Sequence, residues 1–168
     1  MLLKKIDKSK NKGFTLVELI IIVVFIGIFT AIALTRTQSG LNIIQEQIAI
    51  DQITNDIDLA RSMAFANHDT ITIQFSATNG EFDKFYSLYR GPNSNRILIS
   101  DFPNSDGGII SLDNYRMRGV EIKSINFNNS YELQFIPLGD CDLTSEGSIK
   151  LNSKTINIEP LTGKWTIN

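Results

Sequence analysis

The chain contains a long apolar run at residues 14–34, and Glu18 is the only charged residue within it. As an α-helix these 21 residues would span about 31 Å at ~1.5 Å per residue, close to the hydrocarbon thickness of a bilayer. We therefore expect a transmembrane helix over residues 14–34. A charge within the hydrocarbon costs about 2.5–3.5 kcal/mol on insertion scales. A role as a membrane anchor alone therefore does not explain why a charged residue, Glu18, lies within the apolar run.

A helical pattern continues over residues 35–68. Its apolar positions are spaced by seven, three, four, three and four residues, as expected for one face of an amphipathic helix. These positions are Ile43, Ile50, Ile53, Ile57, Ala60 and Ala64. We expect this face to pack on the protein's own sheet. The alternative is that part of it packs on neighbouring subunits, and both can hold along different lengths.

Polar residues indicate where this second helical segment is weak and where it ends. Glycine in a helix costs about 1 kcal/mol relative to alanine, so Ser39-Gly40 is its weakest point. Asn67-His68-Asp69 ends the periodic pattern, and His68 is interpreted as a polar residue at the helix end rather than a ligand. A separate group, expected in solvent, lies off the apolar face: Asp51, Asp56 and Asp58.

From residue 69 to residue 168 the pattern changes to a period of two, which predicts strands. Asn79-Gly80 is a strong signal for a tight hairpin turn between the first two strands. The expected strands cover 70–77, 82–90, 96–102, 109–112, 119–125 and 130–136, and three short ones follow in 147–168. The predicted fold class is α+β, with a long N-terminal helix followed by a β-rich domain built on antiparallel sheet.

Charge divides the chain into a basic head and an acidic body. Five lysines against one aspartate give residues 1–13 a net charge of +4, whereas 11 basic and 17 acidic residues give the remainder −6. Lysines before an apolar span remain cytoplasmic under the positive-inside rule, so the body is expected outside the inner membrane as a periplasmic domain. Residues 36–168 carry −5, which opposes binding to phosphate groups, and no nucleic-acid partner is expected.

The apolar run also allows a secretory signal peptide as an alternative. Ala31-Ile32-Ala33 has the small residues of a cleavage site, and a cut there would release a secreted protein beginning at Leu34. Against this, the run exceeds the usual length of about 7–15 residues and contains Glu18.

The stretch "KGFTLVELIIIVVFIGI" resembles the class III signal of type IV pilins and pseudopilins. The resemblance implies that a prepilin peptidase removes residues 1–13 by cutting between Gly13 and Phe14, and then methylates the new amino terminus of Phe14. Glu18 becomes the fifth mature residue and serves subunit assembly. Many major pilins have proline where this chain has Thr35, which favours a minor subunit.

The body resembles GspH/FimT-type pseudopilins at two places: "ARSMAFANHDTITIQF" at 60–75, and "LQFIPLGD", "GSIKL" and "INIEPLTGKWTI" near the end. This implies a minor pseudopilin of the type II secretion system, at or near the tip of a periplasmic pseudopilus that exports folded proteins. The close alternative is a minor pilin of a type IV pilus, involved in pilus biogenesis, adhesion or DNA uptake. The implied partners are the prepilin peptidase, other pseudopilins or pilins and the inner membrane.

No catalytic motif is found, and neither an enzyme nor a cofactor is expected. The segment "GDCDLTSEG" places Asp140, Asp142, Thr144 and Glu146 at alternate positions, a spacing that can hold calcium. An EF-hand needs glycine at its sixth position and glutamate at its twelfth, and here those are Ser145 and Leu151. We therefore interpret the segment as a solvated acidic loop. Cys141, the one cysteine, is expected to be a free thiol, with a cross-link between chains as the alternative.

Overall fold

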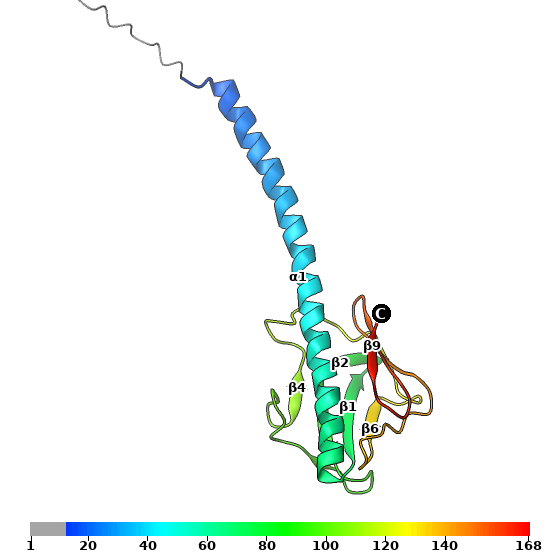
Figure 1. Ribbon diagram of the computed structural model, residues 1–168. Coiled ribbons are helices and arrows are strands. Elements are labelled where there is room, and N and C mark those ends of the chain that lie inside the picture. The colour runs from blue at the N-terminus through cyan, green and yellow to red at the C-terminus, as the bar shows by residue number, and fades with distance from the viewer. Residues whose placement is uncertain (1–12) are drawn as a thin grey trace, which may run out of the picture. The chain divides into compact units, whose positions relative to one another are not determined.

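The computed structural model describes residues 13–168, without the side chains of 35–39 (Figure 1). One helix, α1 (Leu16–Asn67), is followed by nine strands, which confirms the α+β class. The strands are β1 (Ile71–Thr78), β2 (Glu81–Arg90), β3 (Ile97–Leu98), β4 (Ile109–Ser111), β5 (Ser124–Asn126), β6 (Glu132–Phe135), β7 (Gly147–Lys150), β8 (Thr155–Ile158) and β9 (Trp165–Ile167). The expected leader, residues 1–13, lies outside the described residues except for Gly13. The chain forms two compact units, Met1–Gly40 and Leu41–Asn168.

The second unit is built on the apolar face of α1. Five of the six predicted positions are at most 1% exposed, and these are Ile50, Ile53, Ile57, Ala60 and Ala64. The sixth, Ile43, is 62% exposed, so the protein's own chain covers this face from Glu46 onward. The helix continues through Gly40, where the division between the two units falls, and ends as expected beside His68. His68 adopts a positive φ of 50°, which is typical of a residue that terminates a helix.

Two antiparallel sheets complete the unit. The first has the order β3-β2-β1-β6, with β4 also paired to β2, and the second has the order β5-β7-β8-β9. Ile71, Ile73 and Phe75 alternate into the core from β1, as the period-two pattern predicts. In the core these side chains join those of α1 and of the second sheet.

Two predicted strands are much shorter than expected. Within 96–102 only β3 pairs, and within 119–125 only Ser124 and Ile125 belong to a strand, because β5 begins at Ser124. Ile99 and Val120 are nevertheless buried from irregular backbone. Core burial therefore accounts for both apolar residues, and Ile99 adds one backbone hydrogen bond to the Leu88 carbonyl of β2 at 2.9 Å. Sequence periodicity cannot distinguish such buried irregular segments from strands.

The tight turns follow the local sequence closely. Asn79 and Gly80 both have positive φ, 54° and 85°, which gives the two-residue hairpin turn predicted between β1 and β2. Before β9, Gly163 also has positive φ, and a Cβ there would lie 2.5 Å from a ring carbon of Phe135. Glycine is thus required at that position both for the backbone conformation and for the close approach.

Asp56 corrects the expectation that all three aspartates beyond the apolar face meet solvent. Asp51 and Asp58 are exposed, but Asp56 is buried, because Tyr86 of β2 reaches α1 at this point. The Tyr86 hydroxyl donates to Asp56 Oδ2 at 2.5 Å, and Gln52 Nε2 donates to the same oxygen at 2.9 Å. Burial raises the pKa of the Asp56 carboxyl, and the two hydrogen bonds offset only part of that effect.

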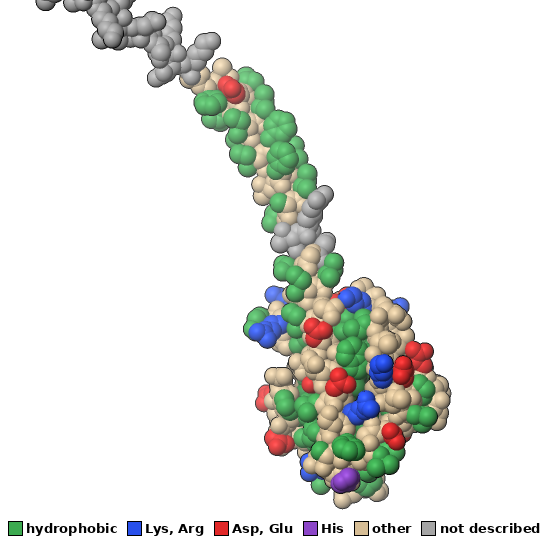
Figure 2. Space-filling view, viewed as in Figure 1, with side chains coloured by type: hydrophobic (Ala, Val, Ile, Leu, Met, Phe, Trp, Pro, Cys, Tyr) green, Lys and Arg blue, Asp and Glu red, His purple; other side chains and the backbone are tan. Residues whose placement is uncertain are grey.

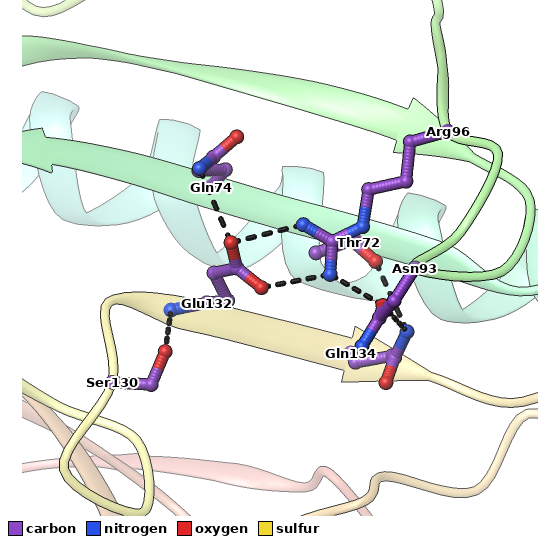
Figure 3. Close-up of polar contacts among 7 residues, drawn as sticks. All are labelled: Thr72, Gln74, Asn93, Arg96, Ser130, Glu132 and Gln134. Carbon is purple, nitrogen blue, oxygen red and sulfur yellow. Dashed lines mark hydrogen bonds and ion pairs between the residues drawn. The ribbon is translucent and has the colours of Figure 1, made fainter.

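On the face of the first sheet shown in Figure 3, an ion pair ties the segment after β2 to β6. The Arg96 guanidinium contacts both carboxylate oxygens of Glu132, at 2.9 and 2.7 Å, and Gln74 of β1 donates to the same carboxylate at 3.1 Å. The hydrogen bond from Arg96 holds the pKa of Glu132 below its ordinary value, against the opposing effect of partial burial. The arrangement holds Arg96 against the sheet and engages both carboxylate oxygens of Glu132.

Glu46 fixes the β7–β8 turn to the first buried turn of α1. Its carboxylate accepts from the Ser153 backbone N–H and the Ser153 hydroxyl, both at 2.6 Å, and from the Lys154 N–H at 3.0 Å. Burial alone would raise the pKa of Glu46, but the hydrogen bonds from Ser153 and Lys154 together lower it below the ordinary value. The charged form is therefore the one that the folded unit stabilises.

We expect Glu46→Ala to lower the free energy of unfolding by about 1–3 kcal/mol at neutral pH, because three donors lose their acceptor. Since the pKa of Glu46 is lower in the folded than in the unfolded chain, its contribution is full above the unfolded pKa and is lost as pH falls through the folded pKa. Glu46→Gln keeps an acceptor oxygen, so it should lose less stability and weaken the acid dependence. Denaturant titrations of the detergent-solubilised chain at neutral and acid pH measure both effects.

The control for this prediction is Glu81→Gln, which removes an exposed carboxylate at the start of β2. Equal stability of Glu46→Ala and the control at neutral pH would contradict a stabilising role for Glu46.

Candidate processing and assembly site

The peptide bond between Gly13 and Phe14 precedes the helix in irregular backbone. Residues 13–15 have no helical or strand assignment, and Phe14 is 78% exposed. No heavy atom lies within 4 Å of the position that a Cβ on Gly13 would occupy. A protease that reads an extended segment can therefore approach this bond, whereas Ala33, the alternative cleavage position, lies inside α1.

Thr15 is the N-cap residue of α1, a role that the motif-based interpretation missed. The backbone N–H of Glu18 donates to Thr15 Oγ1 at 3.2 Å, and the N–H of Leu19 donates to the Thr15 carbonyl, also at 3.2 Å. Threonine followed three residues later by glutamate is the spacing of a capping box, so this signal was present in the sequence. Glu18 also places its carboxylate in the first turn, where the positive end of the helix dipole favours an anion.

The helix that follows is apolar on every side. Leu16–Leu34 is long and apolar enough to cross a membrane, and each of its side chains is exposed. Hydrophobic side chains gather along this part of α1 in Figure 2. The Thr30 hydroxyl donates to the Ile26 carbonyl at 2.7 Å, so its hydrogen bond is satisfied within the helix, as a lipid environment requires. Such a surface has to be covered by lipid or by other helices.

The structure brings the predicted site residues into one short segment. Gly13 and Phe14 lie immediately before the cap, and Glu18 lies on the first helical turn, four residues after Phe14. A new amine on Phe14 would lie four residues before Glu18, a separation in sequence of about one helical turn. The segment therefore places the predicted cleavage bond, the predicted new amine and the Glu18 carboxylate at one end of an apolar helix.

In the acidic segment considered for calcium, exposed and buried side chains alternate. Asp140 and Asp142 are exposed, whereas Cys141 between them is buried. Among the residues that the structure describes, no group of three His, Cys, Asp or Glu side chains could hold a metal ion. The Thr144 backbone N–H and hydroxyl instead donate to Asn128 Oδ1, at 3.1 and 2.9 Å.

Cys141 lies between two chain segments, with bridge pairings to Phe135 and Leu161. Burial raises the pKa of its thiol to about 11, so little reactive thiolate exists at neutral pH. A cross-link between chains would require this region to open. The free thiol expected from the sequence fits this environment better than the cross-link does.

Comparison with known proteins bears on the N-terminal segment alone. Residues 8–34 match the family model described as the prokaryotic N-terminal methylation motif. Neither the curated proteins nor the solved structures give a match to this chain. The matched range contains Gly13, Phe14, Thr15 and Glu18 together with the membrane-length helix. This prepilin-type motif indicates a type IV pilin-like protein.

Proposed function

We propose that this chain is a minor pseudopilin of the type II secretion system, of the GspH/FimT type, which assembles into a periplasmic pseudopilus for protein export. The observation that carries the proposal is the methylation motif at residues 8–34, placed on a capped apolar helix that leads into a helix-on-sheet unit. The role is structural rather than enzymatic. The buried polar contacts of the chain, such as that between Asp56 of α1 and Tyr86 of β2, connect elements of the fold to each other.

The first step of the proposed function is processing at the inner membrane. A prepilin peptidase cuts the exposed bond between Gly13 and Phe14 and methylates the new amine. The lysine-rich head stays cytoplasmic, and the Leu41–Asn168 unit lies in the periplasm. The position of the bond in irregular backbone, directly before the N-cap, supports this step.

The second step is assembly through charge pairing. Methylation leaves the amine of Phe14 positively charged, and in lipid an isolated amine or carboxylate is unfavourable. Pairing the amine of one subunit with Glu18 of its neighbour offsets both costs and sets the register of the arriving helix. The cap supports this role, because Thr15 Oγ1 accepts the Glu18 N–H without using the Glu18 carboxylate.

The subtype rests on the body of the chain. The end of α1 leads through His68 directly into β1, and β7, β8 and β9 form consecutive antiparallel hairpins at the carboxyl end. Both are the regions in which the sequence resembles GspH/FimT-type subunits. A minor pilin of a type IV pilus is the second candidate, because the N-terminal motif serves filaments of either kind.

For processing, we expect Gly13→Leu to block cleavage, because the peptidase requires a small residue before the cut. The uncut chain should remain in the inner membrane with the full precursor mass, whereas Gly13→Ala should retain partial cutting. Mass spectrometry and N-terminal sequencing measure this, with Phe14 expected as the mature terminus. A mature terminus at Leu34 would contradict the pilin-like processing and support a secreted protein.

For assembly, we expect Glu18→Ala and Glu18→Gln to be inserted and cut, but to fail to join the filament. Comparing Glu18→Ala with Glu18→Gln separates the capping role of Glu18 from its charge-pairing role. Glutamine at this position still suits a capping box but carries no charge. Thr15→Ala is the matched control, since it removes the cap acceptor and leaves the carboxylate. Co-purification with partner pseudopilins, together with exoprotein secretion, measures incorporation. Normal assembly of Glu18→Gln would contradict charge pairing and leave capping as the role of the residue.

For nucleic acid, we expect negligible binding of duplex DNA by the purified chain at physiological salt. The 22 carboxyl-terminal residues carry three lysines and one glutamate, and residues 36–168 together carry −5. Phosphate binding depends on clustered basic residues and is opposed by acidic surroundings. A gel-shift titration with duplex DNA at several salt concentrations tests this. Micromolar, salt-sensitive binding would contradict it and favour the DNA-uptake alternative.

A further inference from the structure

The segment between β4 and β5 presents an aromatic ring and two basic side chains to solvent. We call residues 113–119 the Tyr115 loop. Tyr115 is 82% exposed, the Arg116 guanidinium lies 5.8 Å from its ring centroid, and Arg118 is exposed one residue beyond Met117. Met117 itself is buried, and its N–H donates to the Asn114 carbonyl at 3.1 Å. The loop is therefore anchored in the core while Tyr115 and both arginines point outward.

The Tyr115 loop lies at the Glu46 end of the globular unit. Asn152 of the β7–β8 turn donates to the Gly119 carbonyl at 2.8 Å, and the next residue, Ser153, donates to Glu46. Figure 1 likewise shows the chain leaving β4 toward the end of the unit where α1 enters it. The loop and the β7–β8 turn thus share one end of the unit.

Charge is distributed unevenly between this end and the rest of the unit. Contacts bring six basic residues to the Glu46 end: Lys84, Arg116, Arg118, Lys123, Lys150 and Lys154. Six acidic residues accompany them: Glu46, Asp51, Glu81, Asp83, Asp113 and Glu121. The Glu46 carboxylate is held by the turn, and Glu121 is paired with Lys123. The rest of Leu41–Asn168 has four basic and ten acidic residues. The Glu46 end is therefore balanced in charge, whereas the remainder carries −6 and would be repelled by an anionic surface.

Only a short stretch of chain separates the proposed membrane anchor from the start of the globular unit. The apolar span ends at Leu34 and the globular unit begins at Leu41, seven residues later. Even fully extended, seven residues reach at most about 25 Å, and as a helix about 10 Å. Whatever the angle between the two units, the Glu46 end is the part of the globular unit nearest in the chain to the lipid headgroups.

We propose that the Tyr115 loop binds the anionic phospholipid headgroups of the membrane that anchors the chain, holding the globular unit at the bilayer before assembly. Arginines pair with lipid phosphates through charge-assisted hydrogen bonds, and tyrosine is favoured at the membrane–water interface. This inference rests on the membrane anchoring in the proposed function, and it adds a second, peripheral lipid contact. We favour a bilayer over an acidic protein as the partner of the Tyr115 loop, because the chain's own anchor supplies a bilayer seven residues before the globular unit begins.

The test uses the full chain in nanodiscs, with tryptophan placed at the loop by Tyr115→Trp. The matched control is Leu138→Trp, also at an exposed position. Leu138 lines a surface hollow with Phe65, which lies 19 residues beyond Glu46 on α1, or about 28 Å along the helix. Lipids with a nitroxide on the headgroup quench nearby tryptophan, and the constant signal of Trp165 is subtracted using the unsubstituted chain. Discs of phosphatidylcholine are compared with discs that also contain phosphatidylglycerol.

We expect quenching at position 115 but not at 138, and more of it when phosphatidylglycerol is present. Adding Arg116→Gln or Arg118→Gln to Tyr115→Trp should reduce the contact equilibrium by about five-fold for each arginine. High salt should reduce it as well.

Equal quenching at the two positions, or quenching at 115 that ignores lipid charge and both arginines, would overturn the proposal. Absence of quenching from discs of either composition would also overturn it, leaving an acidic protein surface as the partner that the loop fits. Failure of the full chain to enter the discs would instead refute the membrane anchor of the proposed function, an outcome distinct from the absence of quenching.

Discussion

The packing of one face of α1 against both sheets is the interaction on which the globular unit depends. From Ala49 to Ala64 this face holds small and β-branched side chains, and full burial of an isoleucine contributes about 1.5–3 kcal/mol. Polar contacts fix the same helix to each sheet: Asp56 receives Tyr86 from the first sheet, and Asp58 receives the Trp165 indole from the second at 3.2 Å. The sheets do not pair with each other by backbone hydrogen bonds in the described chain, so α1 is a common support for both.

The same helix meets two different environments along its length. Leu16–Leu34 is apolar all round, as in a membrane span, whereas from Ala49 onward only one face is apolar. Between them, Leu41, Ile43 and Ile44 are exposed and apolar on the side chains described. Under the proposed function, neighbouring helices would cover this intermediate stretch in a filament. The expectation that the apolar face packs on the protein's own sheet is confirmed for the buried length of α1, whereas packing of another length on other subunits stays a prediction.

Local signals in the sequence predicted most of the fold, and non-local contacts account for the errors. The helix end at Asn67, the Asn79-Gly80 hairpin and β1, β2 and β6 depend on neighbouring residues or strict alternation, so they could be anticipated. The burial of Asp56 could not, because it depends on Tyr86, 30 residues away. Val120 and Ile99 carried a strand-like pattern but are buried from irregular backbone. The residues proposed for cleavage and assembly were identified as candidates because their spacing is local, and the same spacing also contained the overlooked cap at Thr15.

The N-cap at Thr15 leaves the Glu18 carboxylate available for other interactions. The first backbone donors of a helix need acceptors, and in lipid no water is present to supply them. Because Thr15 Oγ1 already accepts the Glu18 N–H, the carboxylate is not required for that purpose. It remains at the positive end of the helix dipole, where a charge is less costly than deeper in the span. Removal of the leader would add a second charge, the Phe14 amine, about one turn away. Within the proposed function, a lone subunit then holds two charges that lipid cannot solvate, and a staggered neighbour offers each an opposite partner. Under the proposed function, the anchor thus favours assembly through electrostatics while its apolar surface remains compatible with the bilayer.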